Sequence, residues 1–98
     1  MSKVILQISY EIDPTKRDEY LALAKELKNH FVQEQKKNYT IYEQRGKLNF
    51  FIEEFLCNSM EEYEVLEDGM TESSEVLINR LESMLKNGKA KYATLIEI

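Results

Sequence analysis

The chain has 98 residues, of which 43% are hydrophobic and 32% are charged, and its 18 acidic and 13 basic residues give a formal net charge of −5 at pH 7. This length and composition predict a single globular domain over residues 1–98. The negative charge argues against nucleic acid and against an anionic membrane surface as partners, because Lys and Arg carry the binding to both.

The N-terminal segment and the cysteine usage indicate where the protein resides. The stretch MSKVILQISYEI is interrupted by Gln7, Ser9 and Glu11, so we expect neither a signal peptide nor a membrane span there. The single cysteine, Cys57, cannot form an internal disulfide, and its apolar surroundings are typical of a small buried side chain. We therefore expect a cytoplasmic protein.

The first strand and the first helix have clear signals. A strand with one strongly apolar face is predicted by the alternation of Val4, Leu6, Ile8, Tyr10 and Ile12. Asp13 and Pro14 then supply an N-cap and a proline at the first helical position. An apolar stripe at helical spacing extends the helix into the polar segment 33–37, and its members are Tyr20, Leu23, Ala24, Leu27 and Phe31.

A hairpin is predicted next. Residues 39–45 are rich in β-forming side chains, and Gly46-Lys47 suits a two-residue type II′ turn. This turn pairs Arg45 with Leu48 and Ile41 with Ile52. The strand that follows, KLNFFIEEFLC, carries bulky apolar side chains on both of its faces.

Two helices and a last strand complete the chain. Ser59, followed three residues later by Glu62, forms a capping box that opens a short helix, and Gly69 ends or bends it. A further helix starts near Thr71, with Lys86 and Gly88 as C-terminal signals. Residues 91–98 alternate as a fourth strand. The order β-α-β-β-α-α-β predicts a ferredoxin-like α+β fold, an antiparallel four-stranded sheet with its helices on one face.

The two apolar faces of the third strand raise the question of what covers the second one. The hairpin register places Phe50, Ile52 and Leu56 under the helices. The opposite face then carries a set of side chains that we expect at a homodimer interface, namely Gln7, Tyr42, Phe51, Glu53 and Phe55. That set is too aromatic to face water, and a second copy of the sheet is the simplest cover.

The order of these elements resembles a known family. The Asp-Pro helix start, the FFIEEF strand, the SMEEY helix start and the final KYATLIEI strand are similar to those of antibiotic-biosynthesis-monooxygenase-like proteins, which belong to the dimeric α+β barrel superfamily. The resemblance covers nearly the whole chain and is one of pattern, without a diagnostic motif. It implies a homodimer in which two sheets face each other.

The resemblance also implies two chemistries. Enzymes of this family oxidise polycyclic phenols without metal or flavin, or degrade haem. The haem-degrading members use an asparagine, a tryptophan and a histidine, and the corresponding places here resemble Gln7 or a neighbour, Phe55, and a position at about Glu64. Because the chain has no tryptophan and its one histidine lies elsewhere, at His30, haem degradation is disfavoured. Phenol oxidation stays open, and no cofactor is expected.

Four side chains are candidates for binding a small aromatic ligand between helices and sheet, namely Tyr10, His30, Tyr39 and Tyr63. The structural alternative is that the tyrosines fill the edge of the core and that His30 lies at a helix end. We expect no metal site, because His30 and Cys57 lack ligand spacing. The leading hypothesis is a small-molecule-binding homodimer related to cofactor-independent monooxygenases that act on phenolic or quinol-like substrates. The alternative is a non-catalytic interaction or sensing module with a filled core.

Overall fold

The order of elements predicted from the sequence is confirmed. The computed structural model describes residues 2–98. Its elements, in chain order, are β1 (Val4–Ile12), η1 (Pro14–Lys16), α1 (Arg17–Lys28), η2 (Asn29–Glu34), β2 (Tyr39–Glu43), β3 (Phe50–Cys57), α2 (Met60–Asp68), α3 (Glu72–Glu82) and β4 (Leu85–Ile96). None of the helices within residues 2–98 is both long enough and apolar enough to cross a membrane.

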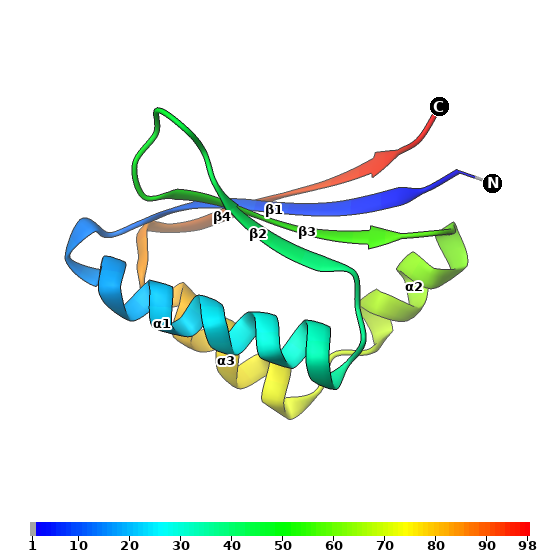
Figure 1. Ribbon diagram of the computed structural model, residues 1–98, viewed down its shortest axis with the longest axis horizontal. Coiled ribbons are helices and arrows are strands. Elements are labelled where there is room, and N and C mark those ends of the chain that lie inside the picture. Colours follow the sequence, from blue (N-terminus) through cyan, green and yellow to red (C-terminus); the bar gives the residue numbers. More distant parts are fainter. Residues whose placement is uncertain (1) are drawn as a thin grey trace.

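The four strands form one antiparallel sheet in the order β2-β3-β1-β4. All the helices lie on one side of the sheet, and the other side is left open (Figure 1). The chain is therefore α+β, with one helix layer on one sheet layer, as the sequence predicted. The core lies between the two layers.

The helix starts follow the predicted capping signals. The Oδ1 atom of Asp13 accepts a hydrogen bond from the backbone N–H of Thr15 at 2.9 Å, just before the helical run that continues through α1 and η2. The Oγ atom of Ser59 accepts from the N–H of Glu62 at 3.2 Å, and the Oγ1 atom of Thr71 accepts from the N–H of Ser74 at 3.1 Å. Each cap satisfies a helix N–H that would otherwise lack a partner.

The predicted hairpin register is wrong by one residue. The structure pairs Tyr42 with Ile52, not Ile41 with Ile52, and the strands are joined by the longer loop 44–49 instead of a two-residue turn. Asn49 ends this loop in the left-handed conformation, at φ +66°, which asparagine tolerates better than most residues do. Because side chains alternate along a strand, a shift of one residue exchanges the two faces of β3.

The expected interface positions of Phe51, Glu53 and Phe55 are therefore corrected. These side chains lie under the helices and are 3–6% exposed. Phe55 contacts the rings of Phe31 and Tyr39, with ring centroids 5.0 and 4.6 Å apart. Phe50, Ile52 and Leu56, which were expected under the helices, instead lie half-buried on the open face.

The last strand begins earlier than predicted. Helix α3 ends at Glu82, and β4 already starts at Leu85, so Lys86 and Gly88 belong to the strand and not to a helix end. The pairing of β4 with β1 shifts between Tyr10 and Ile12, and Gly88 has a φ of +67° within this irregular stretch. A glycine adopts that conformation without steric cost. The irregular stretch borders the cavity described below.

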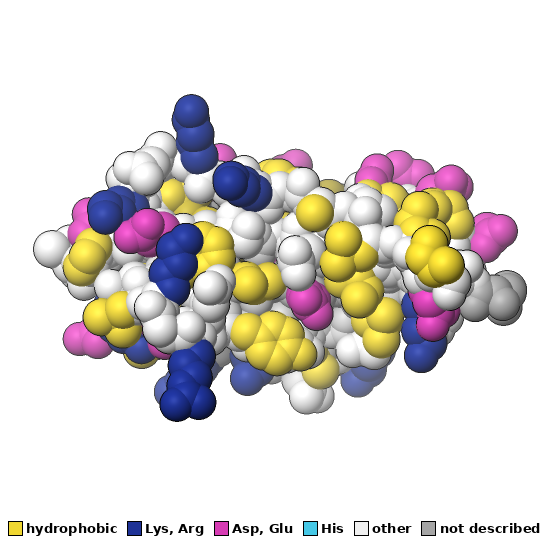
Figure 2. Space-filling view, turned by 90° about the horizontal axis from the view of Figure 1, so that it is seen from above, with side chains coloured by type: hydrophobic (Ala, Val, Ile, Leu, Met, Phe, Trp, Pro, Cys, Tyr) yellow, Lys and Arg dark blue, Asp and Glu magenta, His cyan; other side chains and the backbone are white. Residues whose placement is uncertain are grey.

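The open face of the sheet is partly apolar. Beside the three β3 residues named above, the strand register places Ile5, Gln7, Tyr42 and Leu95 on it. Figure 2, which views this face, shows patches of apolar side chains between charged ones. Gln7 donates a hydrogen bond from Nε2 to Oε2 of Glu54 at 3.0 Å. The polar pair on this face therefore contains Glu54, not Glu53.

Candidate functional site

A cavity of about 570 Å³ lies between the helix-covered face of the sheet and the helices. Its wall on the sheet side comes from β1, β3 and β4, and its other walls come from the helical elements. Most of the lining side chains are apolar, and they include Leu6, Ile8, Phe31, Phe55, Leu66, Ile78 and Leu81. A concave, largely apolar space with few polar groups is the usual form of a small-molecule site.

One buried carboxylate lines this cavity. Glu53 projects from the middle of β3 between Phe51 and Phe55, and its side chain is 4% exposed. Its Oε1 atom accepts a hydrogen bond from the hydroxyl of Tyr39 at 2.5 Å. Its Oε2 atom has no hydrogen-bond partner among residues 2–98. A buried polar atom without a partner is costly, so the Oε2 atom is the natural contact for a polar group in the cavity.

The surroundings of Glu53 make its carboxylate more basic than an exposed one. Burial raises the pKa of the Glu53 carboxyl above its ordinary value of 4.5, and the hydroxyls of Tyr10 and Tyr39 oppose this rise. Burial and then the charge of Glu53 also raise the pKa of Tyr39, so that hydroxyl keeps its proton and remains a donor. The Glu53 carboxylate is thus hydrogen-bonded by Tyr39, and its pKa lies above that of an exposed carboxylate.

Two further buried tyrosines meet in the core, Tyr10 from β1 and Tyr20 from α1. The hydroxyl oxygens of Tyr10 and Tyr20 are 2.7 Å apart, and both side chains are at most 2% exposed. Burial raises the pKa of each above 10.0. Because Tyr10 and Tyr39 belong to the core and do not line the cavity, they can act on a ligand only through Glu53.

Tyr63 is the predicted ligand-binding residue that does line the cavity. It lies on α2, and its hydroxyl is 2.8 Å from the Oγ1 atom of Thr94 on β4. The neighbouring carboxylate of Glu67 raises the pKa of Tyr63. This contact joins α2 to β4 across the cavity wall.

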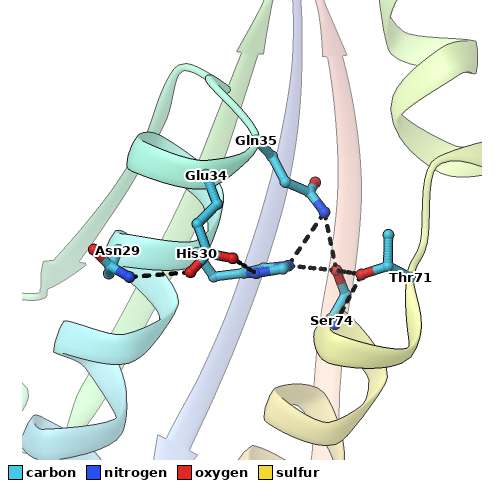
Figure 3. A network of polar contacts seen from close by, with 6 residues as sticks. All are labelled: Asn29, His30, Glu34, Gln35, Thr71 and Ser74. Atoms are coloured by element: carbon cyan, nitrogen blue, oxygen red, sulfur yellow. Dashed lines mark hydrogen bonds and ion pairs between the residues drawn. The ribbon is translucent and has the colours of Figure 1, made fainter.

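His30 lies between two helices, away from Glu53. Its Nε2 atom is 2.7 Å from the Oγ atom of Ser74 and 3.2 Å from the Nε2 atom of Gln35, and its Nδ1 atom is 3.3 Å from Oε1 of Glu34 (Figure 3). His30 lines a separate surface hollow between α1 and α3. These contacts link the end of the α1–η2 helical run to α3.

Glu53 was missed as a site residue because of the hairpin register. From the sequence it was assigned to the open face, with a role in specifying the dimer. The sequence did hold a signal, because Glu53 alternates with Phe51 and Phe55 and therefore lies on the same face of β3 as they do. If the two phenylalanines are buried, Glu53 is buried with them. Only the length of the loop before β3 decided which face that was.

No protein-family model and no curated protein sequence matches the chain. The comparison with solved structures does find similar folds. An antibiotic biosynthesis monooxygenase superimposes with a TM-score of 0.77 at 19% identity, over 100% of this chain and 99% of that one. A variant of SnoaB, a cofactor-independent oxygenase from Streptomyces nogalater, gives a TM-score of 0.72 at 8% identity, over 95% and 90% of the two chains.

A NIPSNAP family protein from Agrobacterium tumefaciens also gives a TM-score of 0.72, at 18% identity and over 95% of this chain and 90% of that one. Likeness at this level of identity concerns the fold, because one fold hosts many activities. The resemblance seen in the sequence is confirmed at that level. The chain has the α+β fold of the antibiotic-biosynthesis-monooxygenase-like proteins.

Proposed function

We propose that the cavity binds a phenolic or quinol-like molecule and that Glu53 accepts the proton of its hydroxyl group, in an oxidation by molecular oxygen that uses no metal or flavin. The observation that carries this proposal is the Oε2 atom of Glu53, which is buried, lines an apolar cavity and lacks a partner among residues 2–98. A ligand hydroxyl donating to Oε2 would satisfy it.

The size and walls of the cavity support an aromatic ligand. A volume of about 570 Å³ falls within the range of small-molecule sites. Phe31 and Phe55, whose ring centroids are 5.0 Å apart, line the same cavity as Glu53, and Leu6 and Ile8 line it from β1. A planar ring between these side chains would hold its hydroxyl near the carboxylate.

The proton transfer follows from the environment of Glu53. A general base works best when its pKa is near the operating pH, and burial moves the pKa of Glu53 in that direction. Tyr39 fixes the carboxylate by donating to Oε1, which leaves Oε2 to take the proton. The resulting phenolate is the electron-rich form that oxygen can oxidise.

The proposed reaction balances without a further reductant. The phenol loses its hydroxyl proton to Glu53 and a ring hydrogen, and it supplies the electrons that reduce oxygen. One oxygen atom enters the ring as a quinone oxygen, and the other leaves as water, which takes up the ring hydrogen and the proton that Glu53 then releases. SnoaB, described as a cofactor-independent oxygenase, shares the fold, which supports this reaction class by analogy.

The test compares neighbouring acids of the same strand. Oxygen uptake and quinone formation are measured with polycyclic phenols for the wild type, Glu53→Gln, Tyr39→Phe and Glu54→Gln. We expect Glu53→Gln to lower the rate by about a hundredfold or more, as loss of a general base does. Glu54→Gln is the matched control, because Glu54 lies on the open face. Oxidation that survives Glu53→Gln at the wild-type rate would contradict the proposal.

The non-catalytic alternative expected a filled core. The cavity beside Glu53 supports a ligand site instead. A sensing module that binds the same ligand without oxidising it would show binding, dependent on Glu53, but no oxygen uptake.

We also propose that the working unit is a homodimer built on the open face of the sheet. Ile52 and Leu56 are half-buried there, while Tyr42 and Leu95 are 51% and 45% exposed. A second copy would bury these side chains and explain why both faces of β3 are apolar. The expected interface thus keeps Gln7 and Tyr42 and takes Ile52 and Leu56 in place of the residues that lie in the core.

A further inference from the structure

The charge of the cavity wall restricts the ligands that the cavity can take. Among residues 2–98, no Lys, Arg or His lines the cavity, whereas three carboxylates do. Glu53 is buried in the wall, and Glu67 on α2 and Glu82 on α3 are exposed. The absence of basic side chains is a feature of the cavity wall, since the chain as a whole carries 13 basic residues.

The carboxylates act on groups that line the cavity. The negative charges of Glu82 and Glu53 both add to the effect of burial in raising the pKa of Tyr92, which lines the cavity from β4. Glu67 raises the pKa of Tyr63, which lines the cavity from α2. A second anion placed between these walls would be repelled in the same way, and more strongly near Glu53, where water is excluded.

We infer that the cavity is a charge filter, which admits uncharged or amine-bearing aromatic compounds and rejects aromatic carboxylates, sulfonates and phosphates. This inference rests on the proposed function for the location of the site and adds the charge of its ligand. The Oε2 atom of Glu53, which has no partner among residues 2–98, can accept a hydrogen bond from a hydroxyl or from an ammonium group. It offers nothing to a carboxylate while Glu53 is ionised.

The inference also bears on the product. An uncharged quinone remains compatible with the cavity wall, whereas a ring-opened aromatic acid would be expelled. The filter therefore fits a reaction that leaves the ring intact and adds no acidic group.

Three probes that share one ring test the filter. Naphthol, naphthylmethylamine and naphthoic acid, each substituted at the same ring carbon, are neutral, cationic and anionic at neutral pH. Their dissociation constants are measured by quenching of naphthalene fluorescence at low and high salt. We expect the acid to bind at least about tenfold more weakly than the naphthol, because like charges meet in a poorly solvated site.

Matched pairs of variants separate the cavity from the overall charge. Glu67→Gln with Glu82→Gln removes the two exposed carboxylates that line the cavity. Glu64→Gln with Glu75→Gln removes two that lie on the same helices but do not line it. We expect the first pair to lower the ratio of the dissociation constants of the acid and the naphthol by about threefold at low salt. The second pair should leave this ratio unchanged. Glu53→Gln should remove most of the remaining difference between the two constants.

Each other outcome has a definite meaning. Equal binding of the acid and the naphthol overturns the filter and leaves the proposed function standing. If the amine binds and the naphthol does not, the rejection of anionic compounds stands and the proposed function is contradicted. An equal effect of the two pairs of variants overturns the filter, because overall charge would then suffice. A failure of all three probes to bind overturns both proposals.

Discussion

The Nε2 atom of His30 lies 2.7 Å from the Oγ atom of Ser74, and this contact joins η2 to the first turn of α3. Both side chains are buried, at 6% and 0% exposure. Thr71, which caps α3 through the N–H of Ser74, also lies 3.1 Å from the Ser74 hydroxyl. One network therefore orders the start of α3 and packs it against the end of the α1–η2 helical run (Figure 3).

Replacing His30 by Ala should lower the free energy of unfolding by about 1–3 kcal/mol, because the buried Ser74 hydroxyl loses a partner. Urea unfolding followed by circular dichroism measures the change. Gln33→Ala, an exposed position in the same segment, is the control and should stay within about 0.5 kcal/mol of the wild type. Equal effects of the two changes would contradict the structural role given to His30.

Glu53 should make stability fall as pH rises. The pKa of Glu53 in the folded protein lies above its unfolded value near 4.5. The contribution of Glu53 to the free energy of unfolding is therefore fully present below pH 4.5 and is lost as the pH rises toward the folded pKa. We therefore expect the stability of Glu53→Gln relative to the wild type to increase with pH above 4.5. Unfolding free energies across this range measure it, and a parallel pH dependence in the two proteins would count against the buried acid.

Glu43 should act in the opposite direction. The guanidinium of Arg17 and the N–H of Asn49 lower the pKa of Glu43 from 4.5 to about 2. The contribution of Glu43 to the free energy of unfolding is present above pH 4.5 and is lost as the pH falls toward 2. Glu43→Gln should therefore be less stable than the wild type at neutral pH, and the two should converge in acid. Acid titration of the folded fraction tests this, and a constant difference down to pH 2 would refute it.

The two phenylalanines that follow Asn49 should respond differently to truncation. Phe51 is 3% exposed and its ring centroid is 4.3 Å from that of Tyr20, whereas Phe50 is half-buried on the open face. We expect Phe51→Ala to cost about 3–5 kcal/mol, a large share of a small domain's stability, and Phe50→Ala much less in the isolated subunit. Thermal unfolding compares them, and the reverse order would restore the register first expected from the sequence.

An acid on the open face should separate the subunits without unfolding them. Ile52→Glu places a charge where the homodimer is proposed, so we expect native mass spectrometry to show a monomer with wild-type circular dichroism. Ile52→Val is the control and should remain dimeric. A wild-type protein that is monomeric at micromolar concentration would remove the proposal and leave the open face without a partner.

Local signals were sufficient for most of the secondary structure. The Asp13-Pro14 start, the Ser59 and Thr71 caps and the alternation over residues 4–12 each act within a few residues, so their elements were predicted correctly. The fold class followed, because the order of elements limits how one sheet and its helices can pack.

The face of β3 was decided only by the tertiary structure. A turn of two residues and a loop of six are both compatible with QRGKLN, and the choice between them depends on Asn49, which is buried and hydrogen-bonded by Arg17 from a distant helix. That choice places Phe51 and Phe55 in the core and turns Glu53 from a surface acid into the carboxylate of a cavity. The sequence by itself determined the elements and their order, since these depend on neighbouring residues. The site depends on the register of two strands, and a register is set by contacts between residues far apart in the chain.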